Sequence, residues 1–350
     1  MNTFKIGERM IGGNSPVYLI AEAGVNHNGD LNLAKKLIDA AAESGADAVK
    51  FQSYVVSELI LPEVEKADYQ KAADKDSANQ TEMLERLRID EAFHHALIAR
   101  CREKKITFLS TPYDIPSLEL LLSLDVPAVK IASTDTTNLL FLEQAGRSKK
   151  PVILSTGMSS LQEIRQAIGC LRDNGCADLA VLKCTSSYPT QLPDVNLKEI
   201  TTFRSYFDAV IGFSDHTPGV GASPYAAALG AKIVEKHFTL DKSLPGPDHP
   251  ASLDPLELNA WVRAIRDVEL MLGHSEIEPA PVELINKKSL QKNLVARTDI
   301  PSGTVLSRSN LAAKRTNGRG IPASAFYEAL GKRVRIPIPT NQPLEWTDLS

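Results

Sequence analysis

The sequence predicts a (β/α)8 barrel followed by a small, β-rich C-terminal domain, and three observations lead to this prediction. Short apolar runs alternate with amphipathic stretches through about the first 272 residues, as parallel strands joined by helices do. Eight such units close into a barrel more readily than they stack into an open sheet. After residue 272 the pattern changes to short strands and turns. We therefore expect a barrel at residues 1–275, a linker at 276–288 and a second domain at 289–350.

The expected elements follow from the positions of the apolar runs. The strands are expected at residues 17–21, 46–51, 106–110, 128–132, 151–154, 179–184, 209–213 and 231–236. Helical spacing appears at residues 31–44, 91–104, 118–123, 139–145, 162–172, 197–205 and 255–272. The polar segment from about 53 to 90, with Tyr69, Gln70 and Asn79, is too long for a simple connection. We interpret it as a lid or a substrate-binding loop.

Composition excludes several classes of protein. The charged fraction of 23% and the hydrophobic fraction of 43% are ordinary for a globular protein. A net charge of −4 gives no footprint for nucleic acid. No apolar run is long enough to span a membrane, and the first residues lack the apolar stretch of a signal peptide. The 4 cysteines show no CxxC spacing, so we expect reduced thiols in a cytoplasmic protein.

Two apolar runs break into polar residues and end with a histidine. These runs are residues 211–217, with His216, and residues 232–239, with His237. If they are neighbouring parallel strands, both imidazoles lie at the same end of the sheet, where they can hold a divalent metal. The alternative is that His237 only satisfies the end of its strand.

Two lysines lie inside apolar strands, which is unusual for a charged side chain. Lys50 and Lys130 would bury their ammonium groups in the barrel mouth, at a cost of several kcal/mol unless an anion is present. A structural pair with Glu22 or Glu235 is one explanation, and an anionic ligand held by both lysines is the preferred one. Hydroxyls and free N–H groups in residues 155–157 and the Ser214 hydroxyl also suit a phosphate or carboxylate. The sequence thus predicts a doubly anionic substrate beside a metal.

The C-terminal part carries a basic, glycine-containing segment at residues 313–321. Short strands are expected around it at 293–296, 299–306, 334–338 and 344–347. The basic segment is either a solvated surface turn or the source of an arginine that reaches an anion at a barrel mouth. If the linker does not fold back, that barrel belongs to another subunit.

Several motifs in these segments carry a family resemblance. They are IAEAGVNHNG at 20–29, ADAVKFQ at 46–52, LSTP at 109–112, LSTGM at 154–158, FSDHT at 213–217, EKHFT at 235–239 and PGPDH at 245–249. Together they resemble the sialic acid synthase family, which includes legionaminate and pseudaminate synthases, and the second domain resembles that family's C-terminal antifreeze-like (SAF) module. The resemblance covers essentially the whole chain.

The resemblance implies a domain-swapped homodimer that condenses phosphoenolpyruvate with an N-acetylated amino sugar, giving a nonulosonic acid and phosphate. It also implies a divalent metal, Mn²⁺ or Mg²⁺, held by His216 and His237. The catalytic positions that match are Glu22, Lys50, Lys130 and Arg315, the last contributed to the partner's site. The positions expected to bind substrate are Gln52, Thr111, Ser133, Asp135, Ser155, Ser186, Tyr188, Ser214 and Asp248.

The sequence departs from the family pattern mainly near the expected sugar site. Asp135 stands where a glutamate is common, Ser186 stands where many members carry asparagine, and Arg319 is a second candidate for the arginine role. These departures leave the sugar open. N-acetylmannosamine is the first expectation, and a diacetylated sugar that gives legionaminic or pseudaminic acid is the second. A non-catalytic sugar-binding protein that keeps the fold is the alternative from another class.

Overall fold

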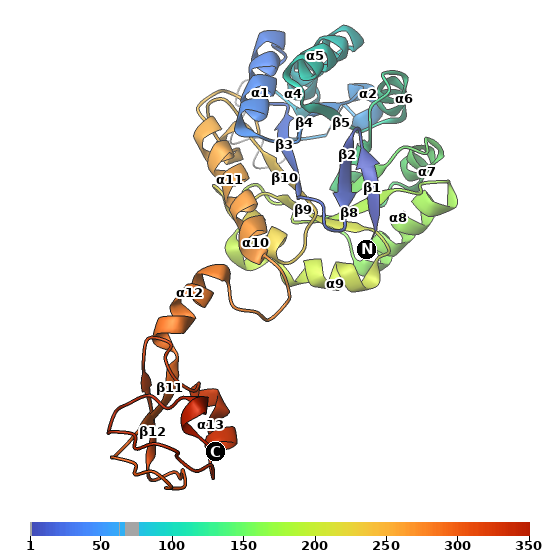
Figure 1. Ribbon diagram of the computed structural model, residues 1–350. Helices are drawn as coiled ribbons and strands as arrows, with labels where there is room; N and C mark the ends of the chain where they lie inside the picture. Colours follow the sequence, from blue (N-terminus) through green and yellow to red (C-terminus); the bar gives the residue numbers. More distant parts are fainter. Residues whose placement is uncertain (1, 63, 67–76) are drawn as a thin grey trace. The chain divides into compact units, whose positions relative to one another are not determined.

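The chain folds into two compact units, Met1–Gly273 and His274–Ser350. The computed structural model describes residues 2–62, 64–66 and 77–350; Tyr69 and Gln70, named above, lie outside the described residues. Figure 1 shows the first unit as a ring of strands surrounded by helices. Among the helices that the structure describes, none combines the length and the hydropathy needed to cross a bilayer.

The first unit is an eight-stranded parallel barrel, as the sequence predicts. Its strands are β3 (Tyr18–Gly24), β4 (Ala48–Ser53), β5 (Thr107–Pro112), β6 (Val129–Ile131), β7 (Val152–Ser155), β8 (Leu179–Cys184), β9 (Val210–Asp215) and β10 (Ile233–His237). They are ordered β5-β4-β3-β10-β9-β8-β7-β6. β5 and β6, the two ends of this order, lie next to each other, so the barrel is nearly closed. His216, which follows β9, and His237, which ends β10, therefore lie at the same end of neighbouring strands.

Helices cover the outside of the barrel. They are α1 (Leu31–Ser44), α5 (Glu91–Lys104), α6 (Ile115–Ser123), α7 (Leu139–Arg147), α8 (Leu161–Asp173), α9 (Lys198–Tyr206), α10 (Ser223–Ala228) and α11 (Pro255–Leu272). Local signals set their ends: Asp30 accepts from the backbone N–H groups that open α1, and Gly45 closes that helix at a φ of 84°. The sequence did not predict α10, which is too short to show a clear helical period.

A hairpin that the sequence analysis did not predict closes one end of the barrel. It consists of β1 (Thr3–Ile6) and β2 (Arg9–Gly12), paired antiparallel. Its apolar side chains, Phe4, Ile6 and Ile11, form one buried cluster with residues at the amino ends of the barrel strands, such as Tyr18 and Ile233. The hairpin therefore plugs the end opposite the strands' carboxyl ends.

This plug gives a stability prediction. Ile11 is fully buried, whereas its neighbour Met10 is 45% exposed on the same strand. Ile11→Ala should lower the free energy of unfolding by about 2–5 kcal/mol because it opens a cavity under the barrel. Met10→Ala should change it by less than about 0.5 kcal/mol. Urea unfolding of both variants is the measurement, and equal, small losses would show that the hairpin does not support the barrel.

The long segment between β4 and β5 is partly helical. It carries α2 (Val56–Leu59) and α4 (Gln80–Leu87), and Asn79 caps α4 by accepting from the Glu82 N–H. Val56, Met83 and Leu87 pack with Val25 and Tyr54 in a small separate core. Burial in this core therefore anchors α2 and α4 at the barrel mouth.

The second unit is built on a two-stranded hairpin with its own small core. β11 (Lys292–Ala296) pairs antiparallel with β12 (Leu311–Arg315), so Arg315 ends a strand rather than lying in a loop. The helix α12 (Pro281–Leu290) occupies most of the predicted linker. The stretches expected as strands at 299–306 and 334–338 are not continuous strands. They meet only in isolated bridges, such as Ile300 with Ile338, because turns break each run.

Candidate active site

The carboxyl ends of the barrel strands enclose a cavity of about 850 Å³. Most of the candidate residues named from the sequence line it, and they come from every strand of the barrel or the loop after it. These are Glu22, Lys50, Gln52, Thr111, Lys130, Ser133, Ser155, Ser186, Tyr188, Ser214, His216, His237 and Asp248. Active sites of (β/α)8 barrels lie on this face.

Lys50 of β4 lies on the floor of the cavity, where its ammonium group contacts side chains of the two neighbouring strands. Its Nζ donates to Thr111 Oγ1 at 2.8 Å and forms an ion pair with Glu22 Oε2 at 2.6 Å. Gln52 Nε2 donates to the other Glu22 oxygen at 3.3 Å. Burial raises the pKa of Glu22 to about 7, even though the Lys50 charge acts to lower it.

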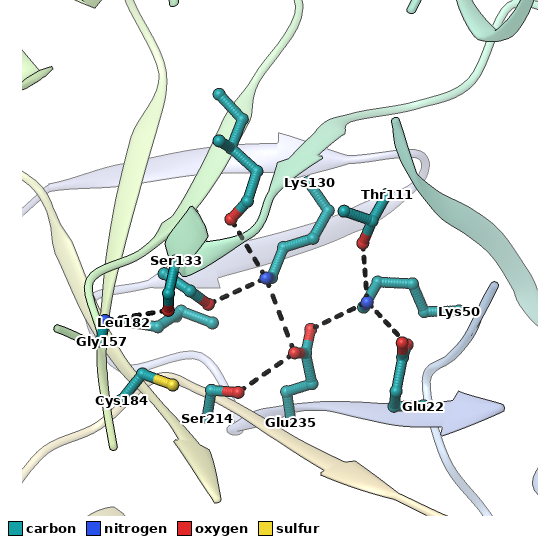
Figure 2. A network of polar contacts seen from close by, with 12 residues as sticks. Glu22, Lys50, Thr111, Lys130, Ser133, Gly157, Leu182, Cys184, Ser214 and Glu235 are labelled. Atoms are coloured by element: carbon teal, nitrogen blue, oxygen red, sulfur yellow. Dashed lines mark hydrogen bonds and ion pairs between the residues drawn. The ribbon is translucent and has the colours of Figure 1, made fainter. Parts of the chain in front are cut away.

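Lys130 of β6 forms the second half of the floor. Its Nζ donates to Ser155 Oγ at 2.8 Å and to the Ile131 carbonyl at 3.3 Å. The Glu235 carboxylate lies between the two lysines, 3.6 Å from Lys130 Nζ and 3.8 Å from Lys50 Nζ, and accepts from Ser214. Figure 2 shows this network. Burial lowers the pKa of Lys130, which Glu235 partly opposes.

Both lysines therefore have carboxylate partners. Such pairing was the less favoured of the two explanations for their burial. Glu235 was named only as one of those partners and not among the candidate site residues. A signal for it exists, because Glu235 is two residues before His237 on the same strand and side chains two apart share one face. Cys184 was also missed as a cavity residue; its Sγ lies 3.9 Å from His216 Nδ1.

The loop after β7 brings hydroxyls and a backbone N–H together. The Gly157 N–H donates to Ser133 Oγ at 2.9 Å. A Cβ at position 157 would lie 2.3 Å from Ser186 Oγ and 2.9 Å from Ser133 Oγ. Only glycine leaves both hydroxyls in place, so the close approach explains the glycine of the LSTGM motif.

Gly157→Ala tests this arrangement. The new methyl group should displace the Ser133 and Ser186 hydroxyls and raise the KM for the anionic substrate about tenfold, as expected for one lost hydrogen bond to a charged group. Gly169 lies in the middle of α8, and a Cβ added there would meet no other atom within 4 Å. Gly169→Ala is therefore the matched control and should leave KM unchanged. Equal KM values in both variants would remove these hydroxyls from substrate binding.

The two histidines lie side by side, with ring centroids 5.6 Å apart. His216 Nδ1 is 2.8 Å from the Thr185 carbonyl, which can only accept, so Nδ1 carries a proton. Burial acts to lower the pKa of His216, but the neighbouring Cys184 and the Thr185 carbonyl together raise it above its usual value. Among the described residues, nothing hydrogen-bonds the buried Nδ1 of His237, which lies 4.0 Å from Asp248 Oδ2. Burial and then the nearby His216 lower the pKa of His237 well below its usual value, so its ring is neutral. The Tyr188 ring lies 4.2 Å from that of His216.

These two imidazoles fit a divalent metal only in part. Within the described part of the chain, no group of three or more His, Cys, Asp or Glu side chains is placed to hold a metal ion. When His216 is neutral, its Nε2 and the His237 ring can still hold a divalent metal whose other positions are filled by water. Such a site would bind a metal weakly and would leave several coordination positions open.

Asp248 and Glu22 both lie beside His237, and an irregular strand end follows Glu22. The pairing of β3 with β4 shifts register between Glu22 and Gly24, and Gly24 has a φ of 51°. Such bulges redirect side chains next to active sites. A Cβ on Gly24 would lie within 3.5 Å of Gln52, Glu22 and Asp248. Burial raises the pKa of Asp248 to about 6.

One candidate residue of the barrel does not line the cavity. Asp135 ends the 3-10 turn Ser133–Asp135 and does not line the cavity, because its carboxylate accepts from Asn138 Nδ2 at 2.9 Å and from Thr134 at 3.2 Å. Arg315 belongs to the second unit, and its role stays a prediction.

The fold and the site define a barrel enzyme whose cavity combines buried lysines, hydroxyls and imidazoles. The chain belongs to the NeuB family: the family's model matches residues 37–277, and the model of the SAF domain matches residues 293–350. The sequence-based recognition of the sialic acid synthase family, with its C-terminal module, is thereby confirmed.

Relatives of this chain carry related enzyme names. It is 42% identical over 339 residues to the N,N'-diacetyllegionaminic acid synthase of Legionella pneumophila, covering 96% of this chain and 95% of the relative. It is 38% identical to the N-acetylneuraminate-9-phosphate synthase of Homo sapiens, covering 94% and 92%. Among solved structures, N-acetylneuraminic acid synthetase of Leptospira borgpetersenii in complex with citrate is 36% identical, with a TM-score of 0.72, covering 83% of this chain and 97% of that one.

Proposed function

We propose that this protein is a nonulosonic acid synthase that condenses phosphoenolpyruvate with an N-acetylated amino sugar and releases phosphate. C3 of phosphoenolpyruvate attacks the aldehyde carbon of the open-chain sugar, water adds to C2, and the resulting tetrahedral carbon loses phosphate. One observation supports this proposal above all: Lys50 and Lys130 share a cavity with His216 and His237. One cavity would thus bind an anionic substrate beside a metal.

Phosphoenolpyruvate fits the floor of the cavity. An ammonium has three N–H donors, and two of those on Lys130 are used by Ser155 and the Ile131 carbonyl. Its 3.6 Å ion pair with Glu235 is too long for a hydrogen bond, so the third donor is available to an incoming phosphate or carboxylate. Ser133, Ser155 and Thr111 supply further hydroxyls. Such donors stabilise the charge that develops as phosphate leaves.

We further propose that His216 and His237 hold Mn²⁺ or Mg²⁺, with the sugar bound beside them. When bound, the metal would act as a Lewis acid toward the aldehyde of the sugar. Tyr188 lies beside both histidines and Asp248 beside His237, and both side chains would position the sugar. Glu22 would either position and deprotonate the attacking water or accept a proton as the sugar ring opens.

We also propose that the enzyme works as a domain-swapped homodimer in which Arg315 completes the partner's site. Large apolar side chains on α12, including Val282, Leu284 and Ile285, are more than half exposed. Contiguous exposed apolar surface marks interaction sites, so α12 is a suitable contact for a second copy.

Mixed dimers test where the arginine acts. Arg315→Ala should lower kcat/KM about a hundredfold, the loss expected for one donor to a developing charge, whereas Arg319→Ala should have little effect. Mixing His237→Ala subunits with Arg315→Ala subunits should restore activity, because some mixed dimers then contain one intact site. If activity returns only with wild-type subunits, the arginine acts within its own chain.

The proposed reaction is tested by phosphate release from phosphoenolpyruvate with Mn²⁺ and each of three sugars. The sugars are N-acetylmannosamine and the diacetylated precursors of legionaminic and pseudaminic acid. Release that requires a sugar supports the synthase, and the rates name the substrate. A protein that binds sugar but consumes no phosphoenolpyruvate with any of them would be a binding protein with the same fold.

A further inference from the structure

Two charged residues directly precede the histidines. Asp215 ends β9 just before His216, and Lys236 of β10 comes just before His237. In both cases the residues on either side line the cavity, and side chains alternate between the two faces of a strand. Asp215 and Lys236 therefore point to the outer face of the barrel, where α10 packs on β9 and β10.

These two side chains form a buried ion pair. Lys236 Nζ lies 2.9 Å from Asp215 Oδ2, and neither side chain is more than 2% exposed. Their Cα atoms are direct partners in the pairing of β9 with β10. A buried ion pair is weak evidence for stability, because apolar residues of similar volume often stabilise a fold at least as well. Stability alone therefore does not explain why two charges are buried here.

The ion pair also holds the backbone that carries His216. Asp215 Oδ1 accepts from the Thr217 N–H at 2.8 Å and from Thr217 Oγ1 at 2.6 Å. Lys236 Nζ donates to the Thr217 carbonyl at 2.6 Å. Ser223, the first residue of α10, donates to Asp215 Oδ2 at 2.6 Å. The pair thus fixes three polar groups of Thr217, one residue after the histidine.

We infer that Asp215 and Lys236 are positioning residues that set the separation of the two imidazoles. The pair ties β9 to β10 at the register step just before the histidines. A metal held by two imidazoles requires both ring nitrogens at once, so its affinity depends on their separation. Changes to residues behind the ligands of a metal typically lower its affinity by about 10–100-fold. The inference rests on the proposed metal site, and it assigns neither residue a contact with metal or substrate.

Removing the lysine tests this role. Lys236→Met should weaken Mn²⁺ binding about tenfold, measured by titrating the full-length protein and following the free ion by electron paramagnetic resonance. Phosphoenolpyruvate affinity, measured by calorimetric titration without Mn²⁺, should not change, because Lys50 and Lys130 keep their contacts on the floor of the cavity. Lys183 of β8 is also buried and pairs with Glu199, so Lys183→Met is the matched control and should keep wild-type Mn²⁺ affinity.

A double variant separates positioning from folding. Lys236→Met leaves the Asp215 carboxylate buried without its cation and should lower stability toward urea. Adding Asp215→Asn removes that charge, and the amide can still accept from the Thr217 N–H and donate to Ser223. Stability should then largely return, while Mn²⁺ affinity stays about tenfold low, because the Thr217 carbonyl still lacks its contact with the lysine. Wild-type Mn²⁺ affinity in the double variant would overturn the inference and show that the pair serves the fold.

Two glycines after Thr217 give a test that leaves the ion pair in place. Gly219 and Gly221 have left-handed φ values of 57° and 59°, so alanine costs similar backbone strain at both positions. A Cβ on Gly221 would lie 1.9 Å from Thr217 Oγ1 and 3.1 Å from Lys236 Nζ, whereas a Cβ on Gly219 would meet no atom within 4 Å. Gly221→Ala should therefore weaken Mn²⁺ binding about tenfold, and Gly219→Ala should not. Equal affinity in the two variants would count against the inference.

The wild-type protein separates this inference from the proposals on which it rests. If it binds Mn²⁺ and every variant binds the ion equally well, the metal site stands and the positioning role is wrong. If the folded wild-type protein binds no Mn²⁺, both are wrong. If it binds Mn²⁺, shows the expected losses in the variants and releases no phosphate with any sugar, only the proposed reaction is overturned.

Discussion

His237→Ala should reduce Mn²⁺-dependent phosphate release about a thousandfold or more. A metal acting as a Lewis acid contributes several kcal/mol, and each 1.36 kcal/mol corresponds to a factor of ten in rate. The fold should survive this change, since His237 Nδ1 has no hydrogen-bond partner among the described residues and its removal leaves no partner unpaired. Thermal unfolding should therefore shift little, while the rate collapses.

Metal binding gives a readout that is independent of turnover. Titrating Mn²⁺ into the protein and following the free ion by electron paramagnetic resonance should show weaker binding in His237→Ala. His95, on α5, has a side chain that is 63% exposed, so His95→Ala should keep both wild-type affinity and wild-type rate. Unchanged Mn²⁺ affinity in His237→Ala would remove this histidine from the metal site, whatever happens to the rate.

The second large effect is expected at Lys130. Lys130→Met should weaken phosphoenolpyruvate binding at least a hundredfold, because removing one partner of a buried charged contact costs about 2–5 kcal/mol. It should also lower the free energy of unfolding by about 3–5 kcal/mol, because Glu235 then keeps only the more distant Lys50 and the Ser214 hydroxyl. Calorimetric titration with phosphoenolpyruvate and urea unfolding measure the two effects separately.

A double variant distinguishes the structural from the ligand-binding role of Lys130. Adding Glu235→Gln to Lys130→Met removes the uncompensated carboxylate, so stability should largely return while phosphoenolpyruvate affinity stays low. Lys183 of β8 pairs with the half-exposed Glu199 and does not line the cavity, so Lys183→Met should leave affinity unchanged. If affinity returns together with stability in the double variant, Lys130 serves the fold and not the ligand.

The same lysines show what the sequence could and could not predict about the site. Their place inside apolar strands predicted two buried ammonium groups at the barrel mouth, and the structure has both there. The sequence did not predict that one carboxylate, Glu235, lies between the two lysines. That position depends on three strands, β4, β6 and β10, which are far apart in the sequence. Sequence spacing cannot report a distance across a barrel.

Errors in the predicted elements have several origins. The bounds of strands with a long apolar run and of helices with clear caps were predicted to within a few residues. The predicted bounds match the observed ones for α1, α5, α11 and β8. The hairpin β1–β2 was missed because its burial depends on contacts with the completed barrel, and α10 was missed because it is too short to show a helical period. The expected strand at 299–306 failed because a turn at residues 302–303, where Gly303 has a φ of 81°, breaks the run and leaves only isolated bridges.

The sequence by itself determined the barrel, the family and the lysines, hydroxyls and histidines that meet in the cavity. Hydrophobic periodicity follows from which face of each element is buried, and polar strand ends in a barrel converge at one mouth whatever the details of packing. Only the tertiary structure decided how the charges pair, which imidazole nitrogens lack a partner, and that Asp135 is held away from the cavity by Asn138. These contacts join segments that are distant along the chain, so they form only when the barrel is closed.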